Sequence, residues 1–141
     1  MNYNDLQNSV YQNAAMGITA LREIIPSVSD TGMKNILIKQ YNGYKKQTEL
    51  TAVQMKDRHM TPSFPPLSSR VMTKAMIKMK LKKDNSTENV AKMLIEGTNT
   101  GIMELTGKLN KTRCSSPQAI ASAKEYLRRE QKYIESLKPY L

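Results

Sequence analysis

The chain has 141 residues, which is enough for one domain with a single hydrophobic core. Lys and Arg outnumber Asp and Glu by 22 to 12, and the net charge of +10 either attracts an anionic partner or only keeps the protein soluble. One cysteine, Cys114, excludes an internal disulfide, and the lack of a signal peptide or a long apolar run predicts a soluble, cytoplasmic protein with no transmembrane segment.

Helical periodicity is the dominant pattern from the N-terminus onward. Apolar residues recur every three or four positions and no segment alternates as a strand does, so we predict an all-α protein. The first helix is expected over residues 5–25, with Asn4 as its N-terminal cap and Pro26 as its stop. Its apolar face is formed by Val10, Ala14, Gly17, Leu21 and Ile24.

The second helix is expected over residues 30–59. Either Ser29 or Asp30 can cap it, because each has a side-chain oxygen that accepts a hydrogen bond from a free backbone N–H. The Pro-rich segment 61–66 that follows is the clearest helix breaker in the chain. The only histidine, His59, falls at the end of this helix, where we expect it to be exposed to solvent.

A shorter basic helix is expected over residues 67–83, a segment with six basic residues and no acidic one. Its basic residues repeat every four positions and predict one ridge, a candidate polyanion-binding surface: Arg70, Lys74, Lys78 and Lys82. The opposite side, here called the Met face, is apolar: Val71, Met72, Ala75, Met76 and Met79. We expect the Met face to pack on the rest of the protein and the ridge to bind polyanions weakly.

Two further long helices complete the chain. The first is expected over residues 86–111, after Asn85 as its cap, and the second over residues 117–138. Ser116 followed by Pro117 is the preferred sequence for the start of a helix.

Glu130 falls on the apolar face of the last helix, and two interpretations remain open. It is a buried carboxylate with a raised pKa and a remnant of a metal ligand, or it leans outward or bonds a tyrosine such as Tyr44. If Glu130 points inward it needs hydrogen-bond donors, and the candidates on the second helix are Tyr41, Tyr44 and Gln47.

The connections predict how these helices are arranged. Short loops join the first two and the last two helices, so each pair should form an antiparallel hairpin. The long connection over residues 60–85 contains the basic helix, which we expect to cross back along a four-helix bundle. Gly17 and Gly101 should let the first and fourth helices approach closely.

The helix order, the helix lengths and the sequence NAAMGITALREIIP at residues 13–26 resemble the ferritin-like superfamily, in particular small bacterial members of unknown function that lack the di-iron ligands. This resemblance implies a ferritin-like four-helix bundle. Di-iron members carry Glu-x-x-His on a helix of each hairpin. Here the residues three positions after Glu49, Glu125, Glu130 and Glu135 are Ala52, Arg128, Tyr133 and Lys138. We therefore expect no di-iron chemistry, no cofactor and no enzyme activity.

Three functional hypotheses follow. The first is a non-catalytic structural or interaction protein, with homo-oligomers as an option. The second is an electrostatic binder of nucleic acid or an anionic membrane through the basic helix. The third is a metal or small-ligand carrier with a degenerate ferritin-like site, which would use carboxylates without histidine: Glu23, Glu49, Glu104 and Glu130.

Overall fold

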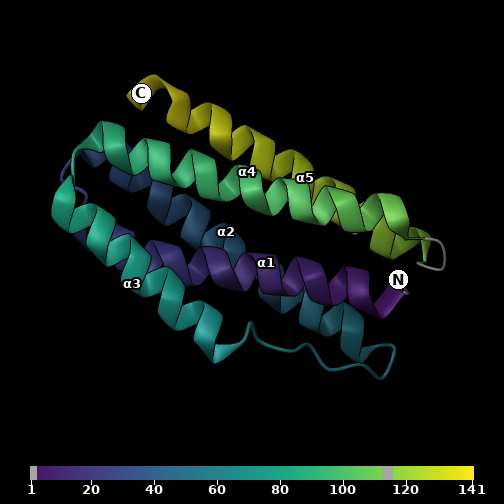
Figure 1. The fold of residues 1–141 in the computed structure, drawn as a ribbon. Helices are drawn as coiled ribbons and strands as arrows, with labels where there is room; N and C mark the ends of the chain where they lie inside the picture. Colours follow the sequence, from purple (N-terminus) through teal and green to yellow (C-terminus); the bar gives the residue numbers. More distant parts are fainter. Residues whose placement is uncertain (1–2, 113–115) are drawn as a thin grey trace.

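The computed structural model describes residues 3–112 and 116–141, and every regular element in these two ranges is helical, which confirms the all-α prediction. Figure 1 shows the long helices packed side by side. They are α1 (Tyr3–Ile24), α2 (Thr31–Lys56), α3 (Leu67–Lys83), α4 (Thr87–Lys111) and α5 (Pro117–Leu137). Short 3-10 turns follow α1 and α5, at Ile25–Ser27 and Lys138–Tyr140.

Side-chain caps define where three helices begin. Asp30 and Ser116 each accept a hydrogen bond from the backbone N–H three residues later, at 2.8 and 3.1 Å, as the sequence predicts. In α4 the cap is Ser86 and not Asn85, because the Ser86 hydroxyl is the group that accepts from the backbone N–H three residues on, at 3.2 Å. The predicted Asn4 cap is wrong, because α1 already includes that residue.

The second helix ends at Lys56, three residues earlier than predicted. His59 adopts the left-handed backbone conformation, with φ of 59°, and reverses the chain direction. The reversal lets the Met60 N–H donate to the carbonyl of Met55 at 2.9 Å, a carbonyl that also accepts from the Arg58 N–H at 3.0 Å. His59 is exposed, as expected.

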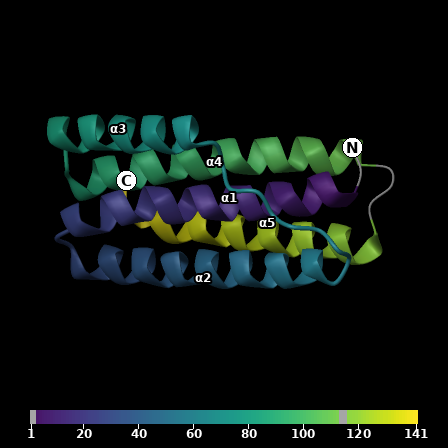
Figure 2. The ribbon, with the colours of Figure 1, turned by 90° about the horizontal axis from the view of Figure 1, so that it is seen from below.

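The chain path joins two antiparallel pairs of helices. Figures 1 and 2 show α1 beside an antiparallel α2, and α4 beside an antiparallel α5. Along the chain, α3 connects the two pairs and carries the chain back to the end of the molecule where α2 begins. As a result α2 and α4 run in the same direction.

The helix α1 is the centre of the core, because it contacts each of the other four helices. Four members of its predicted apolar face are buried, at 3% exposure or less, and Leu6 extends that face by one turn. The fifth member, Gly17, is half-buried and contacts the ring of Tyr44. The apolar pattern of α1 therefore marks the inside of the bundle.

The orientation of α3 differs from the prediction. Ile77 is its one buried residue, and the half-buried Leu81 packs beside it on the core. The predicted contact surface, the Met face, points outward, with Met72 72%, Met79 67%, Val71 55% and Met76 48% exposed. Methionine loses more rotamer entropy on burial than isoleucine or leucine, which favours the observed contact through Ile77 and Leu81.

Candidate functional site

Glu130 is buried at the centre of the bundle, with 4% of its surface exposed. The Tyr44 hydroxyl donates to its carboxyl group, at 2.8 Å from Oε1 and 3.0 Å from Oε2. Gln40 Nε2 donates to Oε2 at 2.9 Å, and the Tyr126 hydroxyl lies 3.0 Å from Oε1. Glu130 therefore combines parts of both interpretations: it is a buried carboxyl, as in the first, and it bonds Tyr44, as in the second.

The set of donors differs from the predicted one. Tyr44 is present, but the Tyr41 hydroxyl instead accepts a hydrogen bond from Arg22 Nε at 3.0 Å. Gln47 is engaged elsewhere, because its amide group bonds Thr51 and Arg129.

Gln40 and Tyr126, which sequence reasoning missed, each lie one helical turn from a residue already singled out. Gln40 precedes Tyr44 by four residues on α2, and Tyr126 precedes Glu130 by four on α5. Because side chains four residues apart on a helix are neighbours, this spacing is a signal that could have identified both donors.

A chain of hydrogen bonds extends from Glu130 to α1 and α4. Tyr126 has one hydroxyl hydrogen but two acceptors within reach, Asn13 Oδ1 at 2.6 Å and Glu130 Oε1 at 3.0 Å. A protonated Glu130 removes the conflict, because it donates to Tyr126, which then donates to Asn13. Asn13 in turn donates to the carbonyl of Gly101 at 3.2 Å.

The electrostatics of the cluster agree with this geometry. Burial raises the pKa of Glu130 above its usual range, and its hydrogen bonds to the two tyrosines and to Gln40 only partly offset that effect. Burial and the nearby carboxyl also raise the pKa values of Tyr44 and Tyr126 well above normal. Both phenols therefore stay protonated and act as donors.

Two glycines make room for this cluster. A Cβ atom on Gly17 would lie 2.4 Å from the ring of Tyr44, and one on Gly101 would lie 2.7 Å from the Asn13 amide nitrogen. The prediction that these glycines bring α1 and α4 close together is confirmed at Gly101, which faces Asn13 of α1, and is wrong at Gly17, which faces Tyr44 of α2. A Cβ atom on Gly97, by contrast, would meet no atom within 4 Å.

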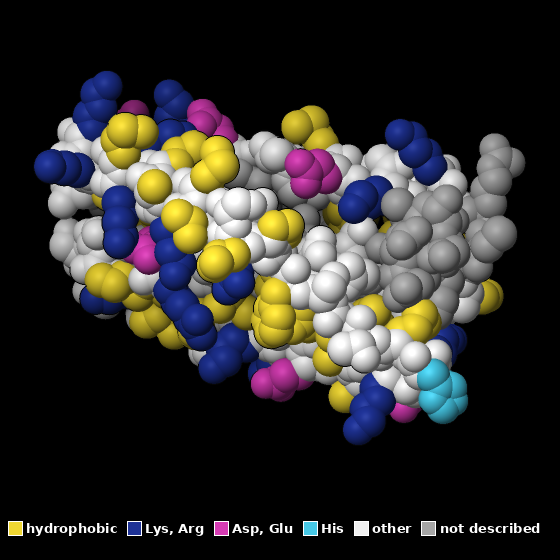
Figure 3. Space-filling model, turned by 60° about the horizontal axis from the view of Figure 1, so that its bottom comes forward, with side chains coloured by type: hydrophobic (Ala, Val, Ile, Leu, Met, Phe, Trp, Pro, Cys, Tyr) yellow, Lys and Arg dark blue, Asp and Glu magenta, His cyan; other side chains and the backbone are white. Residues whose placement is uncertain are grey.

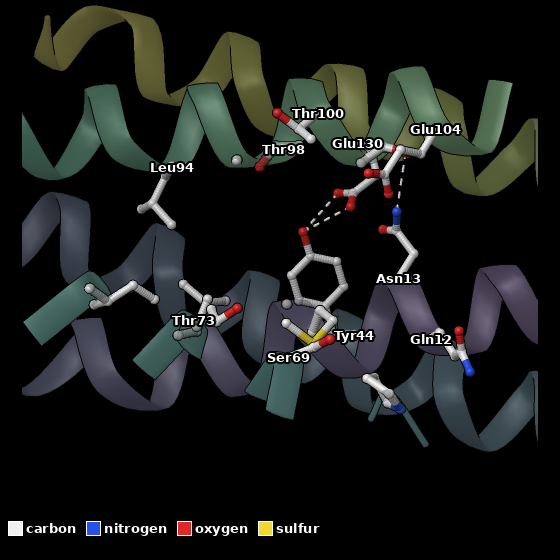
Figure 4. Close-up of a pocket in the computed structure, with 18 of the residues that line it drawn as sticks. Gln12, Asn13, Tyr44, Ser69, Thr73, Leu94, Thr98, Thr100, Glu104 and Glu130 are labelled. Atoms are coloured by element: carbon white, nitrogen blue, oxygen red, sulfur yellow. Dashed lines mark hydrogen bonds between the residues drawn. The ribbon is translucent and has the colours of Figure 1, made fainter. Parts of the chain in front are cut away.

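The cluster lies beside a groove of about 600 Å³. Figure 4 shows Tyr44 and Asn13 reaching from one side toward Glu130, with Thr98, Thr100 and Glu104 along the α4 side. The helices α1, α3 and α4 supply most of the lining, and much of it is apolar: Met16, Ala20, Leu21, Met76, Ile77, Met93 and Leu94. A groove of this size and character is typical of a small-molecule site.

Tyr133 also lines the groove, and its hydroxyl is the most unusual polar group there. The residue is 5% exposed, and the oxygen is buried with no hydrogen-bond partner among the described residues. Its ring meets the Tyr44 ring edge to face, with centroids 6.5 Å apart. Buried hydroxyls are normally satisfied, so this one marks a position where a partner is missing.

The surface of α3 is the second candidate site. Figure 3 shows hydrophobic side chains interspersed with Lys and Arg on the face that includes this helix. Lys74, Lys78 and Lys82 of the predicted ridge are exposed, and Lys78 lies 3.9 Å from the carboxylate of Glu23. Arg70 is half-buried on the side of α3 that faces the bundle. The predicted ridge therefore winds around α3 from the bundle side toward the Met face, and does not lie opposite the Met face.

Metal and nucleophile chemistry has little support in the described part of the chain. No group of three or more His, Cys, Asp or Glu residues there could hold a metal ion. His59 is exposed at the end of α2, far along the chain from Glu130, and Cys114 lies outside the described residues. None of the helices in the described ranges is long and apolar enough to cross a membrane.

Comparisons with protein families, with curated proteins and with solved structures found no significant match to this chain.

Proposed function

We propose that the protein is a non-catalytic interaction protein that docks on anionic membrane surfaces through the Met face of α3 and the lysines around it. The observation that carries the proposal is the outward orientation of the Met face, which leaves four large apolar side chains at 48–72% exposure on one helix. Leu67 at the start of α3 and Phe64 in the segment before it are also exposed, at 66% and 68%. Several large apolar side chains exposed together on one helix are typical of interaction sites.

The charges around the Met face favour an anionic partner. No acidic residue occurs between Asp57 and Asp84, whereas seven Lys and Arg residues lie in that interval. An interfacial helix inserts its apolar side chains at the boundary between headgroups and acyl chains while lysines contact the headgroups. Each lysine near an anionic surface contributes roughly 1 kcal/mol.

A lipid membrane accounts for both the exposed apolar side chains and the lysines of α3, whereas a nucleic acid accounts only for the lysines. Phosphate contacts on nucleic acid need cations and would leave the exposed methionines without a role. Anionic lipids offer phosphates together with an apolar layer. The cytoplasmic leaflet of cell membranes is anionic, in keeping with the cytoplasmic location expected from the sequence.

The bundle itself is, in this proposal, a ferritin-like scaffold without di-iron ligands. The support is the chain path, with two antiparallel pairs joined by a crossover, and the inward position of Glu130 on α5. Such a scaffold would present α3 to a partner without using the interior for iron chemistry.

Binding to vesicles tests the docking proposal. We expect the protein to float with phosphatidylcholine vesicles that contain phosphatidylglycerol, and not with phosphatidylcholine alone. The variant Lys74→Glu/Lys82→Glu should lose vesicle and heparin binding, while a control with the same charge change on α5, Lys124→Glu/Lys132→Glu, should keep both. Lys78 is left intact because it faces Glu23.

A second variant separates lipid from other partners. Met72→Gln/Met79→Gln should lose vesicle binding and keep heparin binding, whereas Met103→Gln, at an equally exposed site on α4, should change neither. Full vesicle binding by the methionine double variant would overturn the proposal in favour of a purely electrostatic, nucleic-acid-like partner. A third outcome is also informative. If the parent does not bind vesicles but is a dimer in size-exclusion chromatography, and the methionine double variant is a monomer, the Met face is a contact between copies of the chain.

A further inference from the structure

The groove beside Glu130 has room for a ligand, and the buried polar side chains in its lining are those of Tyr44, Glu130 and Tyr133. Its volume of about 600 Å³ falls within the range of sites that enclose small organic molecules. Apolar side chains of α1, α3 and α4 line it together with polar and charged ones such as Lys80, Glu104 and Lys108, and Glu130 and Tyr133 also line it. A ligand that uses the apolar residues and the buried polar groups has an apolar body with a polar group at one end, placed at Glu130 and Tyr133.

The charge at the polar end selects the chemistry of that group. No cation forms a salt bridge with Glu130 among the described residues, and the neighbouring Arg129 instead bonds Gln47 and approaches Glu125 at 4.0 Å. A buried carboxyl group without a cation is held in its neutral form or paired with a charge from outside the chain. A ligand cation would supply that opposite charge.

The hydrogen-bonding capacity of the cluster points the same way. A carboxylate has about four acceptor sites, and among the described residues three groups lie within hydrogen-bond distance of Glu130: Tyr44, Gln40 and Tyr126. Tyr126 can donate to Asn13 instead. The hydroxyl oxygen of Tyr133 has no hydrogen-bond partner among the described residues. Acceptor sites on Glu130 and Tyr133 are thus open to the N–H groups of a ligand.

We propose that the groove binds an amphipathic primary amine, whose ammonium group lies at Glu130 and Tyr133 and whose alkyl chain lies along α1 and α4 beneath α3. The ammonium group donates to the Glu130 carboxylate and to the Tyr133 oxygen. Its charge favours ionisation of Glu130, so the carboxyl proton leaves to solvent when the amine binds. The alkyl chain replaces water on the apolar wall, including Ile77 and Leu94.

Three probes with one chain length and different head groups test the proposal. Isothermal titration calorimetry, below the concentrations at which they form micelles, should show n-decylamine binding at least about tenfold more tightly than n-decanol, since hydrogen bonds to charged groups are the stronger ones. Decanoate should bind more weakly than decanol, because its carboxylate would lose its hydration beside Glu130 without a cation to pair with it. Equal affinity for all three probes, or no binding of decylamine, would overturn the proposal.

Substitutions locate the binding in this groove. Glu130→Gln should abolish the preference for decylamine over decanol, whereas Glu104→Gln, an exposed carboxylate on the same groove, should leave it unchanged. Gly97→Leu should block all three probes, because position 97 lines the groove and has open space for a side chain. Gly97→Leu is expected to fold, because leucine is a better helix former than glycine. It therefore tests the site even if Glu130→Gln fails to fold. Unchanged decylamine binding by Gly97→Leu would place the ligand elsewhere.

Discussion

Replacement of Gly17 by alanine is the sharpest test of how α2 packs on α1. The added Cβ atom would lie 2.4 Å from Cε2 of Tyr44, so the ring must move by about 1 Å to reach an ordinary separation of 3.4 Å. The ring is buried and its hydroxyl is held on Glu130 at 2.8 Å, so this movement breaks a hydrogen bond in the core. Alanine therefore meets a neighbour that has little freedom to shift.

The expected cost follows from three contributions. Overpacking costs about 1–3 kcal/mol and a buried carboxyl that loses a donor costs about 1–3 kcal/mol, while alanine recovers roughly 1 kcal/mol of helix propensity. We expect Gly17→Ala to lower the free energy of unfolding by about 1–5 kcal/mol, and the middle of that range lowers Tm by about 10 °C in a chain of this size.

A matched control is available on α2. A Cβ atom on Gly43 would have no atom within 4 Å, so Gly43→Ala should raise the free energy of unfolding by about 0.5–1 kcal/mol. Thermal melts followed by circular dichroism measure both variants. If Gly17→Ala melts at or above the parent temperature, the ring of Tyr44 does not lie against Gly17 and the described packing of α2 on α1 is wrong.

The pKa of Glu130 is higher in the folded protein than in the unfolded chain, where it is about 4.3. The stability that Glu130 contributes is therefore present at low pH and is lost as pH rises through the folded pKa. Urea unfolding at pH 4 and pH 8 should show a larger loss of stability for the parent than for Glu130→Gln. The variant His59→Gly should raise the free energy of unfolding by up to about 1 kcal/mol, since glycine adopts the left-handed conformation without a Cβ penalty, and a destabilised variant would count against that backbone geometry. Elemental analysis of freshly purified protein should find no stoichiometric iron, manganese or zinc, and about two metal atoms per chain would instead mean that carboxylates bind metal without histidine.

The long amphipathic helices are the part of the fold that local sequence patterns predict well. The apolar face of α1 is buried almost as predicted, and the Ser116-Pro117 start of α5 is found in the structure, because both depend on spacing within one helix. Cap positions shift by a residue where several polar residues compete, as at Asn85 and Ser86.

The orientation of α3 could not be predicted by the same means. Its sequence has apolar residues on two sides, the Met face and the line through Ile77 and Leu81, so periodicity alone does not decide which side is buried. The groove is even harder to predict from the sequence, because its lining comes from all five long helices and the segment before α3. Contacts such as Asn13 with Gly101 join residues 88 positions apart, and no local spacing encodes them.

Tyr133 distinguishes a ligand site from a polar cluster that only supports the fold. In a supporting cluster each buried polar group has a partner, yet this hydroxyl is buried without one among the described residues. Removal of an unsatisfied buried hydroxyl relieves a cost of about 1–3 kcal/mol, so Tyr133→Phe should stabilise the free protein in thermal melts. The same substitution should weaken decylamine binding, because the ammonium group loses an acceptor. A variant that is less stable and binds decylamine as tightly as the parent would show that the hydroxyl has a structural partner and no ligand.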